Sequence, residues 1–552
     1  MAAPGTTPSR LPLFLGLGIV GIAVIAGAAF YMGVAGDEPG VMQRSSTYTE
    51  GVTGTWQRVN PLYAAGNDVD QDLSQLVFSG LMRIGPGGEV LPDLANSEPH
   101  ISADGLTYTF PLREDARWHD GEPFTSRDVV FTVEAILGSG FRGDGELAAR
   151  WEDVEVEAPD DHTVRFHLPE PSAPFLARDA TLGILPAHRL EEAGPDGLFD
   201  AGFNFSPVGT GPYQLESLDA NEAVLSANSR YHLGSPGIDK FRFRFYPDQR
   251  EAIAALERGD IDGLFLRSAP REGQLERLES LAGTTVQGFQ RAAHLVLYLN
   301  NDAAAFFRDP RVRQAIALAV DREGIVDSVF GGAATPSSLP IPPGSWAHDG
   351  QYEVTGTDES ALEVARELLD EAGWEESEEN GVRVRLGSEF RLTIRTDSDP
   401  IRLATAQEIA EQLEPLGIRA TVASTSFTVL RRDFLQERRY EAAVAGWDQG
   451  VDPDPYFAWH SSQMGTAGLN IANYSDPVAD RLIEEGRRNP DTGDRLDMYT
   501  QFQEVWDRAV PSVVIAYPHF IYAQAEAIDG AVSEFLPRAH LRFAAVHEWR
   551  RS

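Results

Sequence analysis

A strand, a helix and a second strand follow one another in the C-terminal half of the chain, and this succession constrains the fold more than any other feature. Residues 390–396 read FRLTIRT, which is typical of a strand, residues 401–416 have a helical pattern, and residues 418–423 predict the second strand. Strands in this spacing pair in parallel through a right-handed crossover. The sequence therefore predicts an open α/β sheet in this half.

Further strands and helices are predicted along the rest of the chain. Thr125 begins a capping-box pattern, Asp309 and Pro310 supply an N-cap and a first-turn proline, and Ser360 opens another helix. Proline and glycine loops separate the remaining β-rich runs, so we expect a mixed α/β chain. The predicted strands cover residues 47–53, 106–112, 164–168, 213–218 and 241–246.

The run YEAAVAG at residues 440–446 predicts one more strand of the open sheet. Trp447 and Asp448 follow it directly, at the carboxyl end of the strand. Open α/β sheets bind their ligands at this edge. The loop that begins with these two residues is therefore the best local candidate for a functional site.

The charge of the chain excludes one large class of partner. It has 84 acidic and 46 basic residues and a formal net charge of −38. Such a surface repels a phosphate backbone. We therefore expect no nucleic-acid partner.

Sulfur chemistry and the common catalytic motifs are absent from the sequence. With no cysteine, the chain has no disulfide, thiolate metal site, thiol nucleophile or acylated N-terminal cysteine. It has no G-x-S-x-G elbow, H-E-x-x-H or P-loop, and its 12 histidines show no metal-ligand spacing. We expect a protein that is not an enzyme and holds no metal or cofactor.

An uncharged segment near the N-terminus predicts a membrane anchor. As a helix, residues 11–36 would extend roughly 39 Å, against a hydrocarbon core of about 30 Å. Arg10 precedes the segment and Asp37 follows it, which favours a cytoplasmic N-terminus and a large extracytoplasmic domain. Cleavage as a secretory signal after the small residues 33–35 is the alternative. We expect a single-pass protein of the cell membrane.

Several stretches, taken in order, resemble the family 5 extracellular solute-binding proteins of ABC importers, the oligopeptide, dipeptide and nickel-binding group. The resemblance covers the chain from about residue 47 to its end. The stretches are 48–61 (YTEGVTGTWQRVNP), 76–80 (LVFSG), 92–95 (PDLA), 104–131 (DGLTYTFPLREDARWHDGEPFTSRDVVF), 207–213 (PVGTGPY), 309–322 (DPRVRQAIALAVDR) and 452–480.

This resemblance implies a two-lobed, type II binding-protein fold in its large form, with two chain crossings between the lobes and hinge closure around the ligand. The implied division is a cytoplasmic N-terminus (1–10), an anchor or signal (11–36), a linker (37–46), lobe one (47–289 and 511–552, with an inserted subdomain at about 82–200) and lobe two (290–510).

The resemblance also implies ligand contacts. In peptide-binding relatives the ligand lies extended between the lobes and pairs as an added strand. Thr55 and Trp56 correspond to a lobe-one position that lines the cleft, and Trp447 to a cleft tryptophan. Asp448 follows that tryptophan, where relatives pair an aspartate with the ligand ammonium, although the loop here is one residue shorter before Asp-Pro. Two further candidates are Asn470, which contacts ligand or orients its loop, and Tyr517, which reaches the cleft or packs in the core.

The implied function is that of a substrate-binding component of an ABC importer. We expect a monomer that captures peptides or related small polar solutes and delivers them to permease and ATPase subunits, with no catalysis of its own. Nickel, a nickel chelate or an oligosaccharide is the alternative cargo. A membrane-anchored ligand sensor is the alternative function.

Overall fold

The computed structural model describes residues 46–268, 273–302, 304–351, 357–530 and 535–552, and residues 47–552 form one compact unit. The predicted anchor, residues 11–36, lies outside the described residues. Within the described ranges, no helix combines the length and the apolar character needed to cross a membrane.

One large mixed sheet runs through the unit, in the order β19-β18-β20-β13-β21-β11-β1-β10-β9-β8, with β12 and β14 also paired to β21. The strands are β1 (Thr47–Thr53), β8 (Tyr213–Leu218), β9 (Glu222–Ala227), β10 (Lys240–Tyr246), β11 (Gly263–Leu266), β12 (Thr284–Gln290), β13 (Ala293–Leu299), β14 (Ala334–Pro336), β18 (Arg391–Asp397), β19 (Arg419–Thr425), β20 (Ala442–Asp448) and β21 (Ser512–Ala525).

The predicted strand–helix–strand unit is confirmed. β18 and β19 pair in parallel from Arg391 opposite Arg419 onwards, and α13 (Pro400–Gln412) connects them. β20 lies on the other side of β18 and is also parallel to it. β20 continues through Trp447 and Asp448, which were expected to follow the strand, because β13 pairs with it as far as Asp448.

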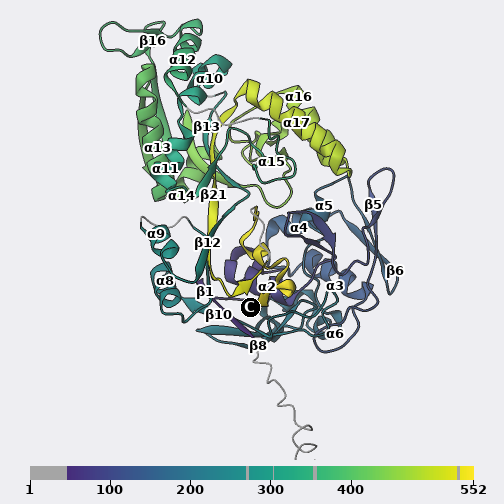
Figure 1. Ribbon diagram of the computed structural model, residues 1–552. Helices are drawn as coiled ribbons and strands as arrows, with labels where there is room; N and C mark the ends of the chain where they lie inside the picture. Colours follow the sequence, from purple (N-terminus) through teal and green to yellow (C-terminus); the bar gives the residue numbers. More distant parts are fainter. Residues whose placement is uncertain (1–45, 269–272, 303, 352–356, 531–534) are drawn as a thin grey trace, which may run out of the picture. The chain divides into compact units, whose positions relative to one another are not determined.

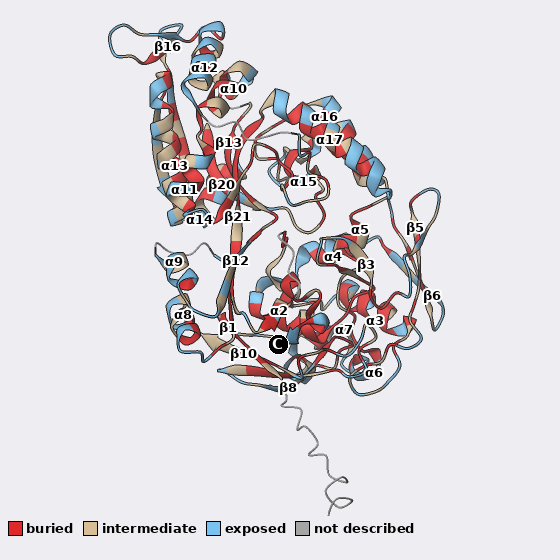
Figure 2. Ribbon diagram, in the orientation of Figure 1, coloured by how far each residue is buried: buried red, intermediate tan, exposed pale blue. Residues whose placement is uncertain are grey.

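Apolar clusters cover both faces of β13, which belongs to the β13 half of the sheet, defined as β13, β18, β19 and β20. Leu295, Leu297 and Leu299 of β13 join one apolar cluster, whereas Val296 and Tyr298 join another. This period of two is that of a strand covered on both faces. Figure 2 shows β13 and β20 in the buried colour, with helices of exposed outer surface around them. The first cluster includes α10 (Pro310–Ala319), α11 (Arg322–Phe330), α12 (Glu359–Glu371) and α13; the second includes α15 (Tyr456–Trp459), α16 (Pro477–Arg488) and α17 (Thr492–Ala509).

β21 belongs to both halves of the sheet. Its first residues, from Ser512 to Ala516, pair with β13, and its later residues pair with β12 and β11. Only the short connection between Gln290 and Ala293 separates β12 from β13. The chain therefore passes twice between the two halves, and Figure 1 shows β21 running between them.

The β1 half of the sheet, defined as β1 and β8–β11, carries a smaller four-stranded sheet and several helices. Thr125 and Asp128 form the predicted capping box of α3. The predicted opening at Ser360 differs slightly, because Asp358 is the cap of α12 and accepts from the Ala361 amide. The remaining main elements are β4 (His100–Ile101), β5 (Thr107–Pro111), β6 (Glu155–Asp160), β7 (Thr163–His167), α2 (Asp68–Val77), α3 (Ser126–Leu137), α4 (Gly145–Trp151), α5 (Phe175–Arg178), α6 (Ala187–Leu190), α8 (Gln249–Glu257) and α9 (Gln274–Glu279).

A buried ionic cluster ties the C-terminal tail to β1 and α2. Arg542 donates from Nε and Nη2 to Glu50, at 3.0 and 2.6 Å, and from Nη1 and Nη2 to Asp72, at 2.8 and 2.6 Å. All three side chains have exposed fractions of 0–1%. Burial alone would raise the pKa of Asp72, but Arg267 and Arg542 outweigh it and lower that pKa. The charges are therefore paired within the core.

Candidate functional site

Helix α2 forms one wall of the candidate site, and its start is fixed by side-chain bonds. Asn67 caps the helix by accepting from the amides of Val69 and Asp70. The buried Asp70 carboxylate accepts from the amides of Gln57 and Arg58, at 2.8 and 3.0 Å. These bonds hold the segment after β1 against the helix.

A pocket of about 230 Å³ lies between α2 and segments that are distant from it in sequence. Its lining comes from α2, the stretch around Phe78 to Ile84, the turn after α5, the C-terminal tail at His540, and Val451. Val451 follows β20 and therefore comes from the β13 half of the sheet. We call this space the Val451 pocket.

Two polar groups of the Val451 pocket have no partner among the described residues. The Ser74 hydroxyl, in a residue with an exposed fraction of 7%, makes no hydrogen bond, and neither does Nε of Arg83. By contrast, Arg178 donates to Asp179 from Nε and Nη2, and Asp93 is held by Nε2 of His232 at 2.6 Å. The free hydrogen-bonding capacity of the pocket is therefore concentrated at Ser74 and Arg83.

Thr55 and Trp56 lie beside α2 but do not line this pocket. Thr55 is exposed, and its carbonyl accepts from the side-chain amide of Asn67. The Trp56 indole is half-buried, donates from Nε1 to the Asp219 carbonyl at 2.7 Å, and packs edge-on against Phe205. Their predicted ligand contacts stay predictions.

Trp447 and Asp448 end β20, close to the segment that reaches the pocket. The half-buried Trp447 is paired across the strands with His294. Asp448 is exposed, accepts from the Gly450 amide, and lies 3.5 Å from Nη2 of Arg538. Both members of this ion pair are more than 40% exposed, and such pairs contribute little to stability. The Asp448 carboxylate can therefore exchange its partner at small cost.

Arg291 adds positive charge near Asp448, in the connection between β12 and β13. Its guanidinium lies 4.6 Å from the centre of the Phe520 ring, and Nη1 donates to the Arg267 carbonyl. Burial lowers the pKa of Arg291, and attraction to Asp448 and Asp68 opposes that effect. Charged groups from both halves of the sheet thus meet where the chain passes between them.

The rest of the loop after β20 is anchored rather than free. The neighbouring Gln449 side chain donates to Nδ1 of His294 and to the Pro340 carbonyl. Asp452 forms a buried bidentate pair with Arg495, at 2.7 and 3.0 Å. Asp454 and Arg487 form a second pair, at 2.8 Å. The loop therefore presents Asp448 and Val451 from fixed positions.

Asn470 and Tyr517 are fully buried and do not lie in the Val451 pocket. The Asn470 amide donates to the carbonyls of Trp459, His460 and Tyr474, and its oxygen accepts from the Tyr474 amide. The Tyr517 hydroxyl donates to the Leu339 carbonyl at 3.0 Å. Loop orientation and core packing describe these contacts, and the predicted ligand roles stay untested.

None of the residues that line the Val451 pocket was predicted from the sequence as a ligand contact. Ser74 lies within α2 and Arg83 follows the family-like stretch LVFSG, so that stretch was the available signal. Nothing in the sequence pointed to His540, which comes from the far end of the chain. Burial, with smaller effects from nearby arginines, lowers the pKa of His540 to about 4. In the described part of the chain, no three His, Asp or Glu side chains gather in a way that could hold a metal ion.

Comparisons with known proteins agree with this architecture. The model of the bacterial extracellular solute-binding proteins, family 5, matches residues 89–468. The oligopeptide-binding protein AppA of Bacillus subtilis is 28% identical over 498 residues, covering 89% of this chain and 90% of AppA.

Two solved structures extend the comparison to the fold. AppA in complex with a nonapeptide superposes with a TM-score of 0.66 at 26% identity, covering 92% of this chain and 99% of AppA. NikZ of Campylobacter jejuni in complex with Ni(L-His) gives a TM-score of 0.69 at 26% identity, covering 92% of this chain and 100% of NikZ. The chain therefore belongs to the bacterial extracellular solute-binding proteins of family 5.

Proposed function

We propose that this chain is the substrate-binding component of an ABC importer, which captures peptides or related small polar solutes and delivers them to permease subunits coupled to an ATPase. One observation carries the cargo assignment: Arg83, which lines the Val451 pocket, and Asp448, three residues before Val451, carry opposite charges. This arrangement suits the carboxylate and the ammonium group of a short peptide. In this proposal the chain binds and releases its cargo and catalyses no reaction.

The proposed binding motion is closure of two lobes about the two chain passages, near Arg291 and near Tyr517. The change of pairing partner within β21 supports a hinge there. Closure would bring Thr55 and Trp56 toward Trp447, in the manner of hinge-bending binding proteins. Small-angle scattering should then show a smaller radius of gyration at saturating ligand, and an unchanged radius would contradict closure.

The proposed role of Asp448 is to bind the ligand ammonium, exchanging Arg538 for it. Calorimetry with a free peptide and its N-acetylated form tests this role. Because a charge-assisted hydrogen bond contributes about 1.5–3 kcal/mol, acetylation and Asp448→Asn should each weaken binding by about tenfold or more. Acetylation should matter little in the Asn variant.

Asp200→Asn is the matched control, because it also removes an exposed carboxylate that is paired with an arginine, Arg142. It should leave the affinity unchanged. Equal affinity of the wild-type protein for both peptides would remove Asp448 from the site.

Native mass spectrometry of the purified protein identifies the cargo directly. A co-purified peptide would support the main proposal. The similarity to NikZ, solved with Ni(L-His), favours a nickel chelate as the second candidate, which the nickel isotope pattern would reveal. A bound oligosaccharide is distinguished by its mass.

The proposed location is the outer face of the cell membrane, with residues 11–36 as a retained anchor. The uncharged segment and the absence of cysteine support this proposal. The intact mass of the membrane-extracted protein should include the N-terminal segment, and a mature form beginning near Gly36 would overturn it. Co-purification with a permease would favour import, and with a kinase the sensor alternative.

A further inference from the structure

A second pocket, of about 780 Å³, lies at the end of the β13 half of the sheet that is far from Asp448. Asn301 follows β13 and Ala509 precedes β21, and both line this pocket. Leu299 pairs with Ala442 at this end of the sheet, whereas Asp448 pairs with Ala293 at the other. Six residues of strand separate the two ends by roughly 20 Å. We call this space the distal pocket.

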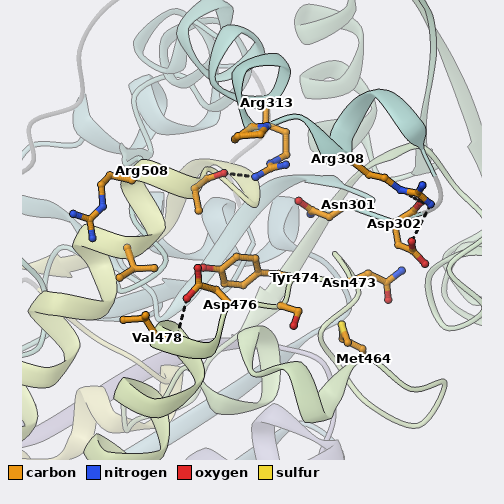
Figure 3. A pocket seen from close by; sticks show the side chains of 14 residues that line it. Asn301, Asp302, Arg308, Arg313, Met464, Asn473, Tyr474, Asp476, Val478 and Arg508 are labelled. Atoms are coloured by element: carbon orange, nitrogen blue, oxygen red, sulfur yellow. Dashed lines mark hydrogen bonds and ion pairs between the residues drawn. The ribbon is translucent and has the colours of Figure 1, made fainter. Parts of the chain in front are cut away.

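Arginines surround the distal pocket, and two of them have no acidic partner. Figure 3 shows Arg313 and Tyr474 between Arg508 on one side and Arg308 on the other. Arg308 forms an ion pair with Asp302, at 3.1 Å. Among the described residues, neither Arg313 nor Arg508 is ion-paired, and three arginines accompany two aspartates, Asp302 and Asp476, in the lining of this pocket, in a chain of net charge −38.

The acidic residue nearest the centre of the pocket is already engaged. Asp476 is the N-cap of α16 and accepts from the amides of Val478 and Ala479, at 2.8 and 3.1 Å. A carboxylate at a helix N-terminus is stabilised where it stands. Its carboxylate keeps its charge, and together with Asp302 it balances two of the three arginines that line the pocket.

Arg313 is held rigidly and still has hydrogens to donate. Its Nε, Nη1 and Nη2 atoms each donate to one backbone carbonyl, of Val510, Phe307 and Ala509, at 2.9, 2.5 and 2.6 Å. A guanidinium has five N–H groups, so two remain after these bonds. Burial lowers the pKa of Arg313 to about 10, and the group is still charged at neutral pH.

The Tyr474 hydroxyl provides an independent sign of a missing ligand. Tyr474 has an exposed fraction of 5%, and its hydroxyl has no hydrogen-bond partner in the described part of the chain. Burial and the nearby carboxylates of Asp476 and Asp480 raise the pKa of Tyr474, and the charge of Arg313 opposes them. A buried hydroxyl without a partner costs free energy that an acceptor from a ligand would recover.

We propose that the distal pocket is a second ligand site, which binds a small oxyanion, a carboxylate or a phosphate, between Arg313, Tyr474 and Arg508. The oxyanion accepts from the two remaining Arg313 hydrogens and from the Tyr474 hydroxyl, and Arg508 adds charge at the rim. Asp448 lies at the opposite end of β20 from the distal pocket, so the oxyanion site is independent of the proposed peptide site.

Calorimetric titration of the full chain with inorganic phosphate and with citrate, at constant ionic strength set with sodium chloride, tests this proposal. We expect saturable binding of one of the two anions, and the anion that binds distinguishes a phosphate from a carboxylate ligand. Tyr474→Phe should raise its dissociation constant about tenfold, because it removes one hydrogen bond to a charged group. Arg508→Gln should raise it severalfold.

Arg431→Gln is the matched control, because Arg431 is an exposed arginine outside the distal pocket. It should leave the dissociation constant unchanged, as should Asp448→Asn. No saturable binding of either anion, or equal weakening by Arg431→Gln and Arg508→Gln, would overturn the site. Wild-type affinity in both Tyr474→Phe and Arg508→Gln would overturn it as well, and Arg508→Gln keeps the test valid if the buried tyrosine variant fails to fold.

Discussion

Replacing Arg542 by methionine tests whether the buried ionic cluster holds the wall of the Val451 pocket in place. Methionine keeps an unbranched stem but is shorter and has no donors, so Glu50 and Asp72 lose a shared partner. Asp72 keeps Arg267, whereas Glu50 keeps only the hydroxyls of Tyr522 and Tyr48, at 2.8 and 3.2 Å. The loss therefore concentrates on Glu50.

The expected cost follows from burial and distance. Charges about 3 Å apart attract by about 5 kcal/mol at an effective dielectric constant of about 20, and the desolvation of both groups offsets much of this. Removing one partner leaves the desolvation cost of Glu50 without its compensation. We expect Arg542→Met to lower the free energy of unfolding by about 3–5 kcal/mol, a large part of the stability of a typical domain.

Urea unfolding, followed by tryptophan fluorescence and by circular dichroism, measures this loss. The double variant Glu50→Gln/Arg542→Met should recover part of it, because no buried charge is then left on β1. Arg481→Met is the matched control: Arg481 pairs with Glu485 on the exposed surface of α16, and such pairs contribute about 0.3–0.5 kcal/mol. A loss below about 1 kcal/mol for Arg542→Met would refute the reasoning.

Three further predictions concern buried polar side chains. Burial lowers the pKa of His294 to about 3, so below about pH 6.5 the unfolded chain binds a proton at this residue and the folded chain does not. The free energy of unfolding should therefore fall as the pH decreases from 6.5 toward 3. In urea titrations at a series of acidic pH values, His294→Gln should reduce this slope by up to about 1.4 kcal/mol per pH unit. Asn470→Ala should lower the free energy of unfolding by about 1–3 kcal/mol in the same assay, because it leaves buried carbonyls without donors. If Asn470 instead contacts the ligand directly, the variant should bind ligand more weakly at unchanged stability. If the Tyr517 hydroxyl serves only to donate to the Leu339 carbonyl, Tyr517→Phe should lower the free energy of unfolding by about 1 kcal/mol in thermal unfolding and leave the peptide affinity unchanged.

Local signals predicted the elements of the fold well, because strand alternation and helix caps are encoded over a few residues. β1 begins and ends at the predicted residues, and the Asp309 cap and the parallel pairing of β18 with β19 were readable from pattern alone. The division of β21 between the two halves of the sheet was not readable. It depends on pairing with β13 and β12, which are more than two hundred residues away in sequence.

The site was less predictable, because its groups become neighbours only through long-range packing. Asp448 was predicted as a ligand contact from its position at the end of a strand, a local signal, and this role stays a prediction. Arg83 and Ser74 lack hydrogen-bond partners because of the tertiary packing around them, and a sequence does not show which side chains lack a partner. For the same reason the sequence left Asn470 open between ligand contact and loop orientation, and it could not reveal that the amide donates to the carbonyls of His460 and Tyr474.

The supports of the proposed site are held by buried ion pairs, whereas Asp448, the residue proposed to bind the ligand, is held by an exposed one. Asp452 and Arg495 anchor the loop after β20 from within the core, and Arg542 anchors α2 on the other side. Asp448, in contrast, is engaged by a long and exposed pair with Arg538. A ligand that displaces Arg538 therefore breaks only this weak ion pair. It also has little backbone to order, since the surrounding backbone is already fixed. Preorganisation of this kind reduces the entropy cost of binding, so in the proposed closure the free energy of contact with the cargo would remain available to move the lobes.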